Sequence, residues 1–212
     1  MDKKQLLMKL KSDNFNEKII NAFEKVKREN FIPSNLKSLA YEDEALPLEK
    51  GATISQPYTI AFMLNLLELK SDYAYASRDT ERKSNSKILE IGSGSGYVLA
   101  LLAEISKNSE IYGVEIISSL ADKSIKLLSN YRNIKIFNKD GFNGLQENAP
   151  FDRILASASA QKIPSHLFKQ LKNKGIIVCP VKNSIFQIKK INNRIKSKEF
   201  PGFVFVPLVK SK

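Results

Sequence analysis

Apolar side chains in residues 15–29 recur at steps of three and four, the spacing that places them on one face of a helix. They are Phe15, Ile19, Phe23 and Val26. The segment therefore predicts an amphipathic helix that ends before Phe31-Ile32-Pro33. Residues 41–50 show no such stripe and predict a loop or short extended structure.

A second helical pattern begins at Pro57, because proline suits the first turn of a helix and Ser55 is a candidate N-cap just before it. The apolar face of this helix consists of Ile60, Met63, Leu64 and Leu67. Residues 70–87 are polar, rich in serine and charge, and show no period, which is typical of a surface connection.

From Lys87 onward, short apolar runs alternate with helical patterns. Strands are expected at KILEI, EIYGVEI, NIKIFNKD, FDRILASAS and GIIVCPV, and helices at VLALLAEI, SLADKSIKLLSN and IPSHLFKQLKN, the last ending before Gly175. This alternation predicts an α/β fold, a doubly wound and mostly parallel sheet with right-handed crossovers. The tail, SIFQIKKINNRIKSKEF and then FVFVPLV, predicts antiparallel strands at an edge of that sheet.

The composition excludes several classes of protein. Among 212 residues there are one cysteine, Cys179, and one histidine, His166, so we expect neither a disulfide scaffold nor a Cys/His metal site. No apolar run approaches the roughly 18 residues of a membrane span, and the N-terminus lacks the apolar core of a secretion signal. We therefore expect a cytoplasmic protein without a membrane partner.

The net charge of +12 is concentrated at one end of the chain. Residues 151–212 contain 13 basic and 2 acidic side chains, whereas the preceding residues are nearly neutral. Such a segment can attract phosphate groups or acidic polypeptides. A solvated, lysine-rich surface explains it equally simply, and the scarcity of interleaved aromatic residues favours that explanation over a nucleic-acid partner.

A glycine-rich loop follows the first predicted parallel strand. Gly92, Gly94 and Gly96 form a G-x-G-x-G pattern, with Glu90 two residues ahead of it. Glycines allow a sharp turn and a close approach to a ligand at a helix N-terminus. The pattern differs from the G-x-G-x-x-G of dinucleotide-binding proteins.

Acidic residues also end the next two predicted strands. Glu115 is placed to accept hydrogen bonds from ribose hydroxyls, and Asp140, before Gly141, from an adenine amino group. Each residue alone could be a turn former or a helix-dipole acid. Together they occupy the carboxyl ends of three consecutive strands, where open α/β sheets bind ligands. Acids disfavour a pyrophosphate and favour a cationic ligand with a sulfonium and an amine, such as S-adenosylmethionine.

Several further motifs are those of one family. The most discriminating is Thr53-Ile54-Ser55-Gln56-Pro57, upstream of the glycine loop. The others are Phe31-Ile32-Pro33, Ala40-Tyr41-Glu42-Asp43, Leu46-Pro47-Leu48, Lys139-Asp140-Gly141, Pro150-Phe151-Asp152, Ile163-Pro164, Gln170-Leu171, Pro180-Val181 and Phe205-Val206-Pro207-Leu208. In these, over nearly its whole length, the chain resembles the protein-L-isoaspartate (D-aspartate) O-methyltransferases, which are Rossmann-like class I S-adenosylmethionine-dependent methyltransferases. It departs from the family pattern at Lys174 and Lys182, where glycine is usual.

The resemblance implies S-adenosylmethionine as cofactor, isoaspartyl-containing peptides and proteins as substrate, and Ser55 as the active-site serine. The implied cofactor-binding residues are Thr53, Ile54, Glu90, Gly92, Ser93, Gly94, Gly96, Glu115, Ile116, Asp140 and Gly141. We expect one methyltransferase domain, present as a monomer. Its parts are an N-terminal helical, substrate-side segment (1–69), the polar connection (70–87), a cofactor-binding core (88–181) and basic C-terminal strands (182–212).

The implied reaction is repair, in which the abnormal α-carboxylate of an L-isoaspartyl residue is methylated to an ester that can cyclise to a succinimide. A carboxylate with a pKa of about 4 is ionised at neutral pH and needs no general base, which suits a chain with a single histidine. Ser55 is therefore expected to position the substrate. Two alternatives remain: a class I methyltransferase with another acceptor such as RNA, suggested by the basic C-terminal quarter, and an inactive cofactor-binding homologue, suggested by the two lysines.

Overall fold

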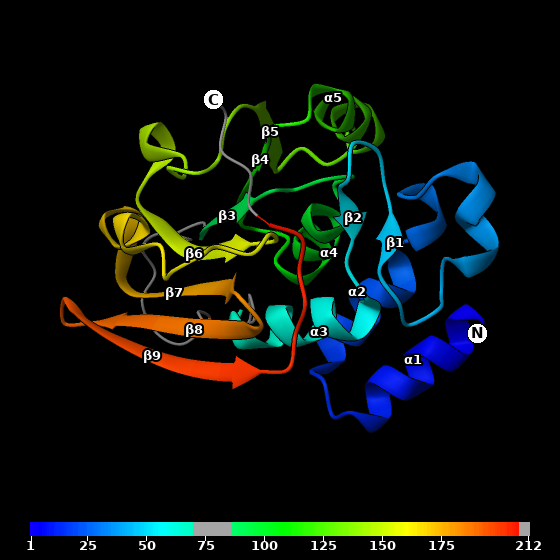
Figure 1. Ribbon diagram of the computed structural model, residues 1–212, viewed down its shortest axis with the longest axis horizontal. Coiled ribbons are helices and arrows are strands. Elements are labelled where there is room, and N and C mark those ends of the chain that lie inside the picture. The colour runs from blue at the N-terminus through cyan, green and yellow to red at the C-terminus, as the bar shows by residue number, and fades with distance from the viewer. Residues whose placement is uncertain (70–85, 208–212) are drawn as a thin grey trace.

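The computed structural model describes residues 1–69 and 86–207, and its centre is a seven-stranded sheet in the order β5-β4-β3-β6-β7-β8-β9 (Figure 1). The strands are β3 (Lys87–Ile91), β4 (Glu110–Glu115), β5 (Ile134–Asn138), β6 (Phe151–Ala156), β7 (Leu171–Val181), β8 (Ser184–Ile191) and β9 (Arg194–Pro201). Neighbouring strands from β5 to β7 are parallel, and β8 is antiparallel to both β7 and β9. The predicted mostly parallel sheet with antiparallel edge strands is confirmed.

Helices and one small hairpin complete the described part of the chain. The α-helices are α1 (Lys3–Ser12), α2 (Glu17–Lys25), α3 (Pro57–Leu66), α4 (Tyr97–Ile105) and α5 (Ser118–Leu127), and the 3₁₀ helices are Arg28–Asn30, Ser34–Leu39, Gln146–Asn148 and Ser165–Gln170. The hairpin pairs β1 (Leu46–Pro47) with β2 (Thr53–Ile54). It lies beside the sheet at the ends to which the parallel strands point (Figure 1).

Alternation along the strands produces one core on each face of the sheet, because successive side chains of a strand point to opposite faces. Ile88 of β3 packs in a core with residues of α1 to α4, such as Leu64 and Leu101. Leu89 and Ile91 pack in the second core, on the opposite face. Glu90 therefore shares the face of Ile88, toward the N-terminal helices and the β1–β2 hairpin.

Two predictions about helix boundaries are wrong. The N-cap of α3 is Gln56 and not Ser55, because the helix begins at Pro57 and the cap is the residue directly before it. The predicted helix around His166 is only the 3₁₀ helix Ser165–Gln170, and Gly175 lies within β7. Leu171 instead pairs with Phe151 of β6, so sheet formation overrides the local helical pattern.

At the two ends of the chain, the structure refines the predictions further. The first predicted helix is shorter, from Glu17 to Lys25, and α1 precedes it without having been predicted. The β8–β9 hairpin turns at Asn192 and Asn193, both at positive φ. Residues 203–206 are not a strand, and Pro207 makes only an isolated bridge to Ser159, so FVFVPLV is not the predicted strand. Its Leu208 and Val209, and nearly all of the polar connection (70–85), lie outside the described residues.

Candidate functional site

The glycine loop between β3 and α4 has a backbone that requires glycine. Gly92, Gly94 and Gly96 have φ values of +78°, +54° and +85°, a region that residues with a Cβ rarely adopt. The amides of Gly92 and Ser93 both donate to the carbonyl of Val114 in β4, at 2.8 and 3.1 Å. Gly96 is the N-cap of α4, and a Cβ there would lie 2.8 Å from Cδ1 of Leu128. The loop is thus hydrogen-bonded to β4, and its last glycine packs against Leu128 at the end of α5.

The carboxylate of Glu115 joins this loop to the end of β4. Its Oε2 accepts a hydrogen bond from the amide of Gly94 at 2.7 Å, and its Oε1 accepts one from the amide of Ile117 at 2.8 Å. An ionised carboxylate offers about four acceptor sites, so the two oxygens have capacity for further donors. In this structure, Glu115 can therefore accept further hydrogen bonds from the hydroxyl groups of a ligand.

Asp140 and Gly141 lie at the end of β5. The Oδ1 of Asp140 accepts from the amide of Phe142 at 2.8 Å, which stabilises the turn. A Cβ on Gly141 would lie 2.9 Å from Cγ2 of Ile91, so only glycine fits against β3 without a shift. This close approach brings the turn after β5 up to the ends of β3 and β4.

A groove runs along these strand ends. It brings together six of the predicted cofactor-binding residues: Thr53, Gly92, Gly94, Glu115, Ile116 and Gly141. Asp140, although adjacent to Gly141, and Gly96, beneath the loop, are not in its wall. Val206 and Pro207 of the C-terminal segment also line the groove.

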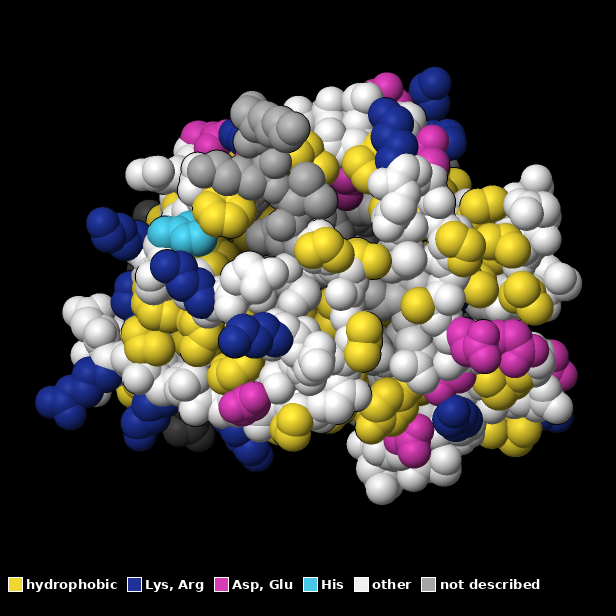
Figure 2. Space-filling view, viewed as in Figure 1, with side chains coloured by type: hydrophobic (Ala, Val, Ile, Leu, Met, Phe, Trp, Pro, Cys, Tyr) yellow, Lys and Arg dark blue, Asp and Glu magenta, His cyan; other side chains and the backbone are white. Residues whose placement is uncertain are grey.

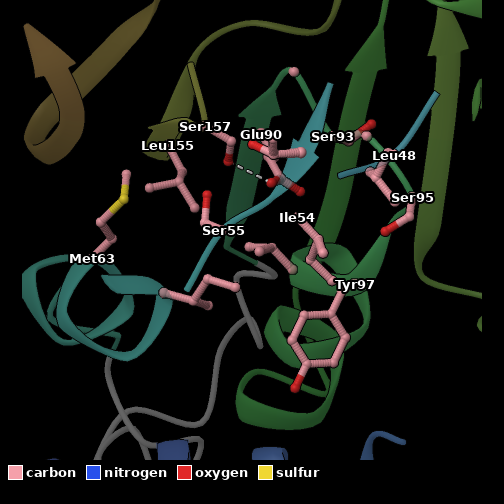
Figure 3. A pocket seen from close by; sticks show the side chains of 15 residues that line it. Leu48, Ile54, Ser55, Met63, Glu90, Ser93, Ser95, Tyr97, Leu155 and Ser157 are labelled. Carbon is pink, nitrogen blue, oxygen red and sulfur yellow. Dashed lines mark hydrogen bonds between the residues drawn. The ribbon is translucent and has the colours of Figure 1, made fainter. Parts of the chain in front are cut away.

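A second pocket adjoins the groove, and both share Thr53, Gly92, Gly94 and Ser157 as wall residues. It contains Ile54, Ser55, Glu90 and Ser93 of the predicted set. Figure 3 shows Ser55 in this pocket next to the Ser157–Glu90 pair, with Met63 of α3 and Leu155 of β6 on one side. Ser55 and the glycine loop therefore face one continuous space.

Glu90 is the most strongly perturbed acid in this pocket. The pKa of its carboxyl is raised to about 8, mainly by burial; the hydrogen bond from Ser157 lowers the pKa in part, and the nearby charge of Glu115 adds to the rise. Its Oε1 accepts that bond from Ser157 Oγ at 2.7 Å. Its Oε2 and the hydroxyl of Ser93 are buried without a partner among the described residues. Unsatisfied buried oxygens of this kind fit a ligand that brings cationic or N–H donors.

Two contributors to the site were not predicted from the sequence. Ser157 directly follows β6, so the rule that ligands bind at the carboxyl ends of parallel strands could have identified it. Arg28, whose guanidinium donates to the carbonyl of Ser55 at 2.9 Å, has no comparable local signal. His166 remains apart from the pocket, with Nε2 2.7 Å from the carbonyl oxygen of Phe142.

None of the described helices is long and apolar enough to cross a bilayer. In residues 1–69 and 86–207, no three His, Cys, Asp or Glu side chains are grouped as metal ligands would be.

Class I S-adenosylmethionine-dependent methyltransferases are expected to have a glycine loop between a parallel strand and a helix, with carboxylates at the ends of neighbouring strands, as seen here for Glu90 in the pocket and Glu115 in the adjoining groove. A family model described as Protein-L-isoaspartate(D-aspartate) O-methyltransferase (PCMT) matches residues 1–212. The chain belongs to this family, and it is an S-adenosylmethionine-dependent protein carboxyl methyltransferase.

Individual relatives agree with this assignment. The chain is 40% identical over 214 residues to a protein-L-isoaspartate O-methyltransferase of Dictyoglomus turgidum, covering 97% of this chain and 90% of the relative. It is 41% identical over 201 residues to that of Petrotoga mobilis, covering 91% and 87%. A crystal structure from Plasmodium falciparum, solved with S-adenosyl-L-homocysteine, superimposes with a TM-score of 0.79 at 25% identity and covers both chains fully. A second solved protein-L-isoaspartate O-methyltransferase shares the fold, with a TM-score of 0.83 at 22% identity, and this chain covers 66% of it.

Proposed function

We propose that this chain transfers a methyl group from S-adenosylmethionine to the α-carboxylate of L-isoaspartyl residues in damaged polypeptides. The observation that supports this best is the continuity of the Ser55 pocket with the strand-end groove, through four shared wall residues. A carboxylate beside Ser55 would then lie next to a cofactor held along the groove. The family match over the whole chain supports the same acceptor.

Within this proposal, the predicted residues divide by location. Glu115 accepts the ribose hydroxyls, and the turn of Asp140 and Gly141 lies against the adenine. Glu90, Ser93 and the glycine loop bind the methionine end of the cofactor. There, Glu90 Oε2 and Ser93 Oγ are buried without hydrogen-bond partners among the described residues and can accept hydrogen bonds from it. Thr53, Ile54 and Ile116 line the space beside the cofactor. Gly96 does not line the groove and acts indirectly, as the N-cap that fixes the start of α4.

The chemistry requires alignment more than acid–base catalysis. Bound S-adenosylmethionine supplies an electrophilic methyl group on a sulfonium. The substrate carboxylate is already ionised at neutral pH, so the chain has no proton to remove. Ser55 orients that carboxylate by donating its hydroxyl hydrogen, and the apolar walls of Ile54, Ile60 and Leu155 keep water from the reacting atoms. The products are a methyl ester and S-adenosylhomocysteine.

The alternative acceptor, RNA, receives little support from the surface. Figure 2 shows the Lys and Arg side chains of the viewed face spread out, with apolar and other side chains between them. Lys189 forms an ion pair with Glu68, with Nζ 2.5 Å from Oε1. Lys190 donates hydrogen bonds to the carbonyls of Phe168 and Leu171. The cytoplasmic location and the monomeric state expected from the sequence stay predictions.

Paired peptides that differ only in containing isoaspartate or aspartate test the proposal. The protein is incubated with each peptide, or with RNA, and a donor with a radiolabelled methyl group. We expect base-labile label in the isoaspartyl peptide alone, since an ester is hydrolysed by base. Label in RNA would replace this function with the second acceptor, and cofactor binding without transfer to any of the three would indicate an inactive homologue.

A further inference from the structure

Arg28 is a cation buried completely within the protein, with none of its surface exposed. It belongs to no ion pair among residues 1–69 and 86–207, and its Nε has no hydrogen-bond partner there. Burial lowers the pKa of its guanidinium to about 10, so it remains charged at neutral pH. A buried charge without a paired carboxylate costs free energy, and an apolar side chain of similar volume would stabilise the fold at least as well. Stability alone therefore does not explain this arginine.

Arg28 contacts two residues that line the pocket, Ser55 and Tyr97. Nη1 donates to the carbonyl of Ser55 at 2.9 Å, and Nη2 donates to the carbonyl of Glu44 at 3.2 Å. The guanidinium also lies over the ring of Tyr97, 5.5 Å from its centre. Tyr97 is the first residue of α4, directly after the glycine loop, and lines the same pocket as Ser55. One side chain thus touches the serine segment and the helix that supports the loop.

The Ser55 segment has little else to fix it. The β1–β2 ladder pairs only two residues of each strand, Leu46 with Ile54 and Pro47 with Thr53, so Ser55 lies just beyond its end. On the other side, the amide of Tyr58 donates to Oδ1 of Asp43 at 2.8 Å. Between these two anchors, Arg28 supplies a side-chain hydrogen bond that holds the Ser55 backbone.

We propose that Arg28 is a positioning residue for methyl transfer, because it fixes the carbonyl of Ser55 and thereby aims the Ser55 hydroxyl into the pocket. This inference rests on the proposed role of Ser55. Arg28 touches neither substrate nor cofactor, so its contribution passes entirely through the serine. Removing its hydrogen bond should lower kcat without weakening the binding of S-adenosylhomocysteine.

A double-mutant cycle tests this, with kcat and KM measured on an isoaspartyl peptide and the Kd of S-adenosylhomocysteine measured by calorimetry. The variants are Arg28→Lys, Arg28→Met, Ser55→Ala and both double mutants, each checked for folding by thermal unfolding. Arg28→Met retains the apolar stem and removes the buried charge, so it keeps the test open should the lysine variant fold poorly. Arg132→Lys, at an exposed arginine, is the matched control and should change nothing.

We expect each Arg28 variant to lower kcat roughly 10–100-fold in the wild-type background, since small misplacements of orienting groups have effects of that size. In the Ser55→Ala background the same substitutions should change kcat less than about twofold, because coupled residues are not additive. Equal losses in both backgrounds, or a matching loss of S-adenosylhomocysteine affinity, would overturn the positioning role alone. A Ser55→Ala variant with normal kcat would overturn the role of Ser55 and, with it, this inference, whereas absence of methylation of the isoaspartyl peptide by the wild type would overturn the proposed function itself.

Discussion

The glycine-loop side of the site is held by hydrogen bonds to the neighbouring strand β4, whereas the Ser55 side is held by a short hairpin and by the side chain of Arg28, distant in the sequence. Gly92, Ser93 and Gly94 donate their amides to β4, directly or through the carboxylate of Glu115. Ser55 depends on Arg28 and on a ladder of only two residue pairs. In the proposed function, the first side binds the cofactor, which is the same in every reaction, and it is hydrogen-bonded directly to the sheet. The second meets a substrate that differs in sequence from one damaged site to the next, and it lies on a separate hairpin.

Replacing Gly96 with valine should have the largest effect on the loop side. The backbone at φ +85° disfavours any side chain, and the new atoms would collide with Leu128 and Ser124. We expect the free energy of unfolding to fall by about 3 kcal/mol and cofactor binding to be lost. Denaturant unfolding and calorimetry measure the two effects. Gly202→Val is the control, since its φ is +96° and nothing lies within 4 Å of its Cβ, and it should cost only about 1 kcal/mol. Equal losses at both positions would mean that the collision is unimportant.

Ser55→Ala and Glu115→Ala should separate the two sides. We expect Ser55→Ala to lower kcat about 100-fold while S-adenosylhomocysteine affinity changes less than about twofold, because an orienting donor acts mainly in the transition state. Glu115→Ala should weaken S-adenosylhomocysteine binding by about 2 kcal/mol, the worth of charge-assisted hydrogen bonds. Equal effects of the two changes on affinity, in variants with normal thermal unfolding, would contradict the division of roles.

Glu90→Gln should reveal the electrostatic strain on the loop side. The folded protein keeps the Glu90 proton until its pKa of about 8, whereas the unfolded chain releases it near 4.3. Between these values the folded state keeps the Glu90 proton while the unfolded chain releases it. The free energy of unfolding of the wild type therefore falls progressively as the pH rises. Without cofactor, the free energy of unfolding of Glu90→Gln should match that of the wild type near pH 4 and exceed it by a margin that grows up to pH 8. A stability difference that does not vary with pH would refute this.

Lys174→Gly tests the same backbone rule with the smallest expected effect, away from the site. Lys174 and Lys182, where the family pattern has glycine, both have positive φ, of 65° and 53°. Lys174→Gly should therefore raise the free energy of unfolding by about 1 kcal/mol and leave kcat unchanged. Lys196→Gly, in the strand β9, is the control and should lower stability by about 0.5 kcal/mol. Destabilisation by Lys174→Gly would show that the lysine side chain contributes contacts that outweigh its strained backbone.

The contrast between the two sides also explains which features the sequence could predict. The glycine loop and the strand-end acids are local patterns, and their convergence follows from the topology of a parallel sheet. Arg28 is 27 residues from Ser55 and 16 from Glu44 in the sequence. Because its partners are main-chain carbonyls, no pattern of side chains in the sequence predicts these contacts. Likewise, the helix expected around His166 failed because Leu171 pairs with Phe151, a contact that local periodicity does not contain.

The position of Val206 and Pro207 has a consequence for synthesis. The carbonyl of Val206 accepts a hydrogen bond from the amide of Ser159 at 2.8 Å. Val206 and Pro207 line the groove together with residues 50–53 of the β1–β2 hairpin. On a ribosome, where folding proceeds from the N-terminus, the sheet from β3 to β6 can form while this wall is still missing. In the proposed function, the nascent chain therefore lacks part of the wall of its cofactor groove until residue 207 has emerged.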